Sequence, residues 1–209
     1  MSAHPDDYSL KRFMLSAILW LPLSFFVWFL WSGVFVAPVE WLVQWILNLW
    51  APDSFNDVLR TGYQLEIEVF IELPPEMSRI GQGRPVAAIP VNPMIYGYGF
   101  PLLAGLAIST PQPLLQRALQ LVAGYLAVAL VQAWGTVFEI FQTLYFQLGE
   151  EGRATLEALG ISPDLIALGY QFGYLILPGV VPVALWILMN RRFIEGLVPA
   201  WHFEGDRGG

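Results

Sequence analysis

The chain of 209 residues is 56% hydrophobic and only 13% charged, so its polar groups are too few to cover a soluble globule of this size. Its formal net charge of -7 disfavours binding to nucleic acid or to an anionic lipid surface, because both attract clusters of Lys and Arg. There is no Cys, which removes thiolate nucleophiles and Cys-ligated metals, and both His residues, His4 and His202, lie in polar tails, which argues against a catalytic or metal-ligating His. We expect no metal and no cofactor.

Residues 13–37 are predicted to form the first membrane-spanning helix. The uncharged apolar run follows Lys11 and Arg12 directly, and at 1.5 Å per residue it is long enough to cross a hydrocarbon layer of about 30 Å. The run exceeds the apolar region of a signal peptide and lacks a convincing cleavage site. We therefore expect an uncleaved anchor, preceded by a cytoplasmic tail over residues 1–12.

Residues 38–50 begin at Pro38 and form a second, shorter apolar stretch. Glu40, Gln44 and Asn48 recur at intervals of four, so they share one face of a helix, and Trp41 and Trp45 lie among the other positions. The stretch is too short to span a bilayer, and we predict an interfacial amphipathic helix. The alternative is that it extends the first helix out of the membrane. Its candidate docking residues are Glu40, Trp41, Gln44 and Trp45.

Residues 51–92 are the main polar segment and are predicted to lie outside the cytoplasm. Apolar residues alternate with polar ones from Gln64 to Leu73, which is typical of a strand with one buried face. Pro74 and Pro75 end this strand, a turn follows at residues 81–83, and residues 86–89 supply a partner strand before Pro90. Because a two-stranded ribbon is marginally stable alone, we expect it to rest on the Trp-rich helix or on a partner protein.

Three further spans are predicted. Residues 93–110 form a short, bent helix two, residues 114–148 a long helix three, and residues 165–190 helix four. Helix four follows a polar extracytoplasmic loop over residues 149–164, whose Ser162-Pro163-Asp164 end is typical of a helix N-terminus. Gly169 and Gly173 favour close helix packing there. The predicted fold is therefore mainly α, an integral membrane four-helix bundle with an interfacial amphipathic helix and a small extracytoplasmic β ribbon.

Cationic residues at the helix ends predict the orientation. They all flank the same side of a four-helix arrangement, which places both termini in the cytoplasm and makes residues 191–209 a cytoplasmic tail. The residues concerned are Lys11, Arg12, Arg117, Arg191 and Arg192.

Glu139 is the most costly residue within the predicted spans, because an ionised carboxylate in hydrocarbon must be paired, neutralised or hydrated. Gln132, Thr136, Glu139 and Gln142 follow helical spacing and form a polar stripe that should face other helices. Three interpretations remain open: a site for a proton, ion or polar substrate, polar contacts between helices, or a position near the outer surface. Candidate neighbours on other spans are Tyr96, Tyr98, Gln171 and Tyr174, and Asn92, just before helix two, is a further candidate site residue.

The stretch Asn92-Pro93-Met94-Ile95-Tyr96-Gly97-Tyr98-Gly99-Phe100-Pro101-Leu102-Leu103, together with the Trp-rich first span, the outer strand and the total length, resembles the exosortase H-associated membrane proteins. The resemblance implies a bacterial inner-membrane protein that works beside an exosortase, a membrane transpeptidase that processes proteins with a C-terminal sorting tail. Exosortases use a Cys nucleophile with Arg and His partners. A chain without Cys cannot be the transpeptidase by that mechanism, so the resemblance implies an accessory role.

Two main functions are therefore expected. The first is a non-catalytic accessory or scaffold protein whose partners are the lipid bilayer and an exosortase-like transpeptidase, with a homo-oligomer also compatible with the sequence. The second is a small membrane transporter or membrane enzyme centred on Glu139. A structural subunit of a larger energy-transducing complex is a third class that the Trp-rich spans permit.

Overall fold

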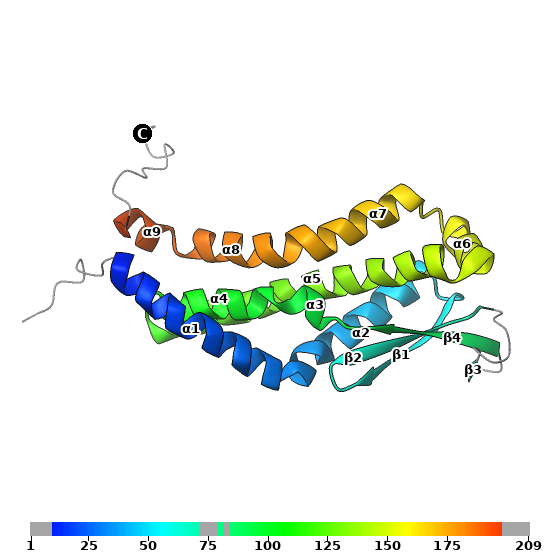
Figure 1. Ribbon diagram of the computed structural model, residues 1–209, viewed down its shortest axis with the longest axis horizontal. Coiled ribbons are helices and arrows are strands. Elements are labelled where there is room, and N and C mark those ends of the chain that lie inside the picture. The colour runs from blue at the N-terminus through cyan, green and yellow to red at the C-terminus, as the bar shows by residue number, and fades with distance from the viewer. Residues whose placement is uncertain (1–9, 72–78, 82–83, 198–209) are drawn as a thin grey trace, which may run out of the picture.

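The computed structural model describes residues 10–71, 79–81 and 84–197, and one long helix, α5 (Leu114–Gln147), runs along the whole molecule (Figure 1). Helices α4 (Gly99–Ser109) and α8 (Leu177–Met189) pack against one half of α5, and α1 (Leu10–Leu30) packs against α4. Helix α2 (Ser32–Trp50), the sheet and α7 (Pro163–Gln171) surround the other half. Parts of the expected tails (residues 1–9 and 198–209), the strand end at residues 73–75 and the turn at residues 82–83 lie outside the described residues.

One end of the molecule, here called the cationic end, contains the start of α1, the turn before α5 and the junction of α8 with α9 (Arg191–Leu197). Phe13 stacks on Trp186 with ring centroids 5.7 Å apart, and the Trp186 indole nitrogen donates to the Thr110 hydroxyl at 3.1 Å. The helix ends that carry Lys11, Arg12, Arg117, Arg191 and Arg192 therefore meet at one end of the bundle.

The break between the first two helices lies at Trp31, several residues before the expected boundary at Pro38. Pro38 lies within α2 instead, where its missing N–H frees the carbonyl of Val34, four residues earlier. The Tyr125 hydroxyl of α5 donates to that Val34 carbonyl at 3.4 Å. A hydrogen bond from a neighbouring helix thus replaces one that the sequence cannot make locally, which explains why the proline does not end the helix.

Four helical segments of the described chain are long and apolar enough to cross a membrane, which agrees with the expected number. They are α1, α2, α5 and the continuous segment Pro163–Met189. The set differs from the predicted one. The expected helix two consists of α3 (Met94–Gly97) and α4, which together are shorter than the other candidates. Helix α2 has the length and composition of a span because it begins at Ser32, but it packs against β1 and the last part of α5.

The sheet lies at the opposite end, here called the sheet end, and is larger than the two-stranded ribbon that we expected. Its antiparallel strand order is β1-β2-β4-β3, with β1 (Phe55–Thr61), β2 (Gln64–Val69), β3 (Arg79–Gly81) and β4 (Arg84–Val91). The predicted pairing of β2 with β4 is present, with Ile67 opposite Ile89. Strand β1 is an addition, and it pairs with β2 and contacts α2.

One buried hydrophobic core joins the sheet to the helices. The inward side chains of β2, including Leu65 and Ile67, pack with one face of α2 and with the last part of α5. The α2 contribution is Val36, Val39, Val43 and Leu47. The sheet therefore rests on the Trp-rich helix, as its marginal independent stability requires.

The segment after α5 is helical rather than an irregular loop. Helix α6 (Gly149–Ala158) folds back against α5, and the Ser162 hydroxyl accepts a hydrogen bond from the Leu165 amide at 3.2 Å at the start of α7. A π-helical segment, η2 (Phe172–Ile176), connects α7 to α8. It ends two residues before Pro178, whose ring nitrogen cannot donate to a carbonyl four residues earlier.

Candidate functional site

Glu139 forms a hydrogen bond across the helix interface with Tyr96. The Tyr96 hydroxyl of α3 donates to the Glu139 carboxylate of α5 at 2.7 Å, and the Tyr96 side chain is only 1% exposed. Glu139 itself is half-buried and forms no ion pair with any residue in the described part of the chain. The Asn92 side chain accepts from the Met94 amide at 3.1 Å, which fixes the turn that introduces α3.

The polar stripe of α5 faces this same turn. Gln132 is 2% exposed, and its amide nitrogen donates to the Pro93 carbonyl at 3.1 Å. Thr136 is completely buried, and its hydroxyl has no hydrogen-bond partner among the described residues. Two of the stripe's residues, Gln132 and Glu139, thus hold the segment between β4 and α4 against α5.

Glycine residues allow these elements to approach one another. A Cβ on Gly135 would lie 2.4 Å from the Tyr96 ring, and a Cβ on Gly97 would lie 2.4 Å from the Gln132 amide. A Cβ on Gly173 would lie 2.9 Å from the Gly135 Cα, so α5 and η2 are also in close contact. Only residues without a side chain permit this spacing.

Three tyrosine rings form a chain of ring contacts that begins at Tyr96, the hydrogen-bond partner of Glu139. Tyr96 contacts Tyr174 edge to face at 6.4 Å, and Tyr174 stacks on Tyr170 at 5.9 Å with an interplanar angle of 12°. Tyr174 is 45% exposed, whereas Tyr170 is half-buried. Tyr170 was not among the predicted site residues, although its spacing of four from Tyr174 places both rings on one helix face.

The remaining predicted site residues lie elsewhere or make weaker contributions. Gln142 and Tyr98 are half-buried, and the Tyr98 hydroxyl lies near Gly179 of α8. Gln171 is exposed. These three residues form no hydrogen bond with Glu139.

The position of Glu139 along α5 gives its axial distance from the cationic end. At 1.5 Å per residue, Glu139 lies about 33 Å from Arg117, close to the thickness of a hydrocarbon layer. With the same rise per residue, Trp31 lies about 29 Å from Arg12, and Tyr170 lies about 32 Å from Arg191. A hydrocarbon layer placed with one boundary at the cationic end would therefore end near Trp31, Glu139 and Tyr170, and aromatic residues are typical of such a boundary.

The polar face of α2 contacts the sheet and is not a free docking surface. Glu40 forms a salt bridge with Arg60 of β1 at 2.6 Å, and the Gln44 side chain accepts from the Val58 amide at 2.7 Å. Trp41 and Trp45 point away from the core and are 68% and 55% exposed. Of the four candidate docking residues, the structure leaves the two tryptophans available and uses the other two to hold the sheet.

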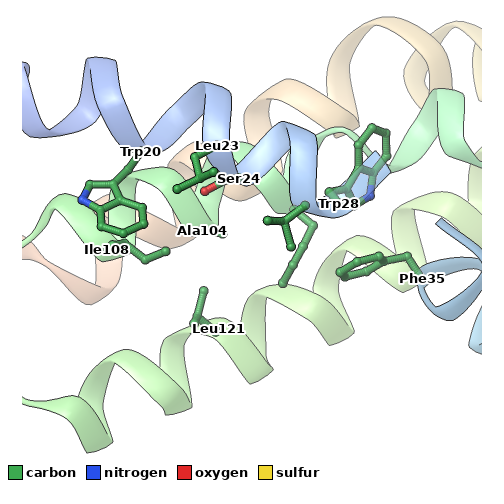
Figure 2. Close-up of a pocket in the computed structure, with 10 residues that line it drawn as sticks. Trp20, Leu23, Ser24, Trp28, Phe35, Ala104, Ile108 and Leu121 are labelled. Carbon is green, nitrogen blue, oxygen red and sulfur yellow. The ribbon is translucent and has the colours of Figure 1, made fainter. Parts of the chain in front are cut away.

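A cavity of about 210 Å³ lies between α1, α4 and α5 (Figure 2). Trp20 and Trp28 of α1 lie along one side, and Leu121 of α5 lies across from α1. Ser24 contributes the one hydroxyl of a lining that is otherwise apolar except for the indole nitrogens. Such a lining suits hydrocarbon rather than a polar substrate.

The described residues contain no group of three or more His, Asp or Glu side chains that could hold a metal ion. The apolar helices, the bundle at the cationic end and the sheet at the other end define the chain as a helical membrane protein with a compact β subdomain on one side. The family model described as exosortase H-associated membrane protein matches residues 7–193. The chain belongs to this family. No curated protein and no solved structure matches it.

Proposed function

We propose that this chain is a non-catalytic accessory protein, a scaffold for an exosortase-type sorting and processing system in the bacterial inner membrane. The family name supports association with an exosortase. The cationic end supports an orientation with both termini in the cytoplasm and the sheet outside it, because loops rich in Lys and Arg stay on the cytoplasmic side.

The observation that carries this proposal is an exposed apolar stripe on α2. It consists of Trp41, Trp45 and Leu49, which recur at intervals of four and are 68%, 55% and 64% exposed. Helix α2 begins after Trp31, at the end of the hydrocarbon layer defined above, and it runs beside α5 toward the sheet end (Figure 1). The stripe therefore lies beyond the layer, where exposed aromatic residues favour contact with a partner protein.

Co-purification tests the proposal. The chain is purified in mild detergent from a membrane that contains the cognate exosortase, and we expect the two proteins to elute together. The double variant Trp41→Gln/Trp45→Gln should lose the exosortase. The control Phe146→Gln, at an exposed aromatic residue of α5, should retain it. Elution of the wild-type chain without the exosortase, together with normal processing of tailed substrates after deletion, contradicts the accessory role.

A second candidate function, a small transporter or membrane enzyme, is favoured by the hydrogen bond between Tyr96 and Glu139. A carboxylate held by a buried tyrosine can bind or transfer a proton. Glu139→Gln keeps the shape of the side chain and removes its charge. Loss of function of this variant in a complementation assay, with normal folding and exosortase binding, supports the second candidate, and full function excludes it.

A further inference from the structure

The carboxylate of Glu139 has no cationic partner among the described residues. Its one hydrogen bond comes from Tyr96, and it forms no ion pair with the described residues. An ionised carboxylate at the edge of a hydrocarbon layer is stabilised by an opposite charge or by water. Because Glu139 is half-buried, part of its surface remains accessible to a ligand.

The tyrosines next to Glu139 have the chemistry that recognises ammonium groups. Aromatic rings attract a cation that lies over their faces, and neighbouring tyrosines with a carboxylate combine this attraction with a direct charge pair. Tyr174 and Tyr170 stack with nearly parallel rings, and Tyr174 is 45% exposed. Neither hydroxyl forms a hydrogen bond with another residue of the described chain, so both can accept from a ligand N–H.

The surroundings of this cluster point to a lipid as the source of the ammonium group. Leu175 and Phe172, which flank Tyr174 on η2, are 66% and 47% exposed, as expected for side chains in contact with acyl chains. The axial distances place Glu139 and Tyr170 where headgroups begin. The nearby helix α6 carries Glu150, Glu151 and Glu157 against Arg153 alone, and this acidic balance disfavours an anionic headgroup.

We propose that Glu139, Tyr170 and Tyr174 form a binding site for the primary ammonium headgroup of a phospholipid at the outer boundary of the membrane. The ammonium donates to the Glu139 carboxylate, and the stacked pair of Tyr170 and Tyr174 supplies an aromatic face to it. Tyr96 is a positioning residue, because its hydroxyl holds the carboxylate toward this side of α5. This inference is independent of the accessory role, since it requires no protein partner.

The test uses the full chain in nanodiscs with equal parts of phosphatidylethanolamine and phosphatidylglycerol that carry the same acyl chains. The protein is released from the nanodiscs, and native mass spectrometry counts the lipids that remain bound. We expect the wild type to retain phosphatidylethanolamine about tenfold over phosphatidylglycerol, which corresponds to a modest charge-pair advantage. Glu139→Gln should lose this preference, and the matched control Glu157→Gln on exposed α6 should keep it.

A second variant keeps the test decisive if Glu139→Gln does not fold. Tyr174→Leu removes an exposed ring and leaves the carboxylate in place, and we expect it to reduce the lipid preference severalfold. Equal retention of the two lipids by the wild type, or an unchanged preference in Tyr174→Leu and in folded Glu139→Gln, overturns the proposal. Loss of a co-purifying protein from Glu139→Gln with unchanged lipid retention instead assigns the site to a cationic side chain of a polypeptide and also overturns it.

Discussion

At the scale of single residues, the close contact of α3, η2 and α5 depends on glycine residues, which have no side chain. Gly135 is the centre of this contact, because it faces the Tyr96 ring on one side and Gly173 on the other. In a close-packed interior there is no room for even one additional methyl group at such a point. The hydrogen bond between Tyr96 and Glu139 therefore depends on a residue that takes no part in it.

Gly135→Ala should lower the free energy of unfolding by about 1–3 kcal/mol, since the new methyl group must displace the Tyr96 ring. Gly179→Ala on α8 is the matched control, because its Cβ would meet nothing closer than 3.8 Å. Alanine also favours the helix, so this control should be neutral or slightly stabilising. Thermal unfolding in detergent measures both variants, and equal melting temperatures contradict the packing argument.

At the scale of elements, the faces of α2 lie in three different environments. Its apolar face enters the core, its polar side chains hold β1, and its tryptophans remain exposed. The salt bridge between Glu40 and Arg60 is about one third exposed at both ends, so its contribution to stability is small, about 0–1 kcal/mol. Burial of the apolar face therefore provides most of the attachment of α2.

Leu47→Ala and Leu49→Ala test this division, because residues two positions apart in an α-helix lie on opposite faces. Leu47 is completely buried in the core, so its truncation should cost about 2–5 kcal/mol of unfolding free energy. Leu49 is 64% exposed, and its truncation should change that free energy by less than about 0.5 kcal/mol. Denaturant titration of both variants provides the measurement. Similar costs at the two positions would show that the exposed face is covered in the folded protein.

At the scale of the whole molecule, the position of the cationic residues agrees with the lengths of the helices that start from them. The cationic residues lie at one end of the bundle, and the break at Trp31 and the residue Glu139 lie about one hydrocarbon thickness away. The sheet, α6 and most of α2 lie beyond that distance, toward the sheet end (Figure 1). A single layer of that thickness would account both for where α1 ends and for where the polar part of the chain begins.

Single-cysteine labelling tests the orientation directly, because the natural sequence contains no Cys and each variant has one reactive site. Ala158→Cys on exposed α6 should react with a membrane-impermeant maleimide in intact inner-membrane spheroplasts. Gly196→Cys on α9, with no other residue within 4 Å of its added Cβ, should react only after the membrane is permeabilised. The reverse pattern would place the termini outside the cytoplasm.

The sequence by itself determined the properties that depend on composition and on local periodicity. Hydrophobic runs predicted a helical membrane protein with four candidate spans, and the alternation from Leu65 to Ile71 predicted β2. The stretch around Asn92–Leu103 also indicated the family that the matched residues 7–193 establish. Each of these signals is contained within a few turns of helix or a few residues of strand, so no distant part of the chain is needed to detect it.

Only the tertiary structure decided the features that depend on distant partners. Strand β1 has an irregular register between Phe55 and Val58, so it shows no alternation, and its pairing with β2 and its contact with α2 make it a strand. The helix continues through Pro38 because Tyr125 supplies a hydrogen-bond donor from α5. Glu139 meets Tyr96, rather than Tyr98 or Gln171, because glycines bring α3 and α5 close at that one point, and close packing between segments far apart in sequence leaves no local periodic signal.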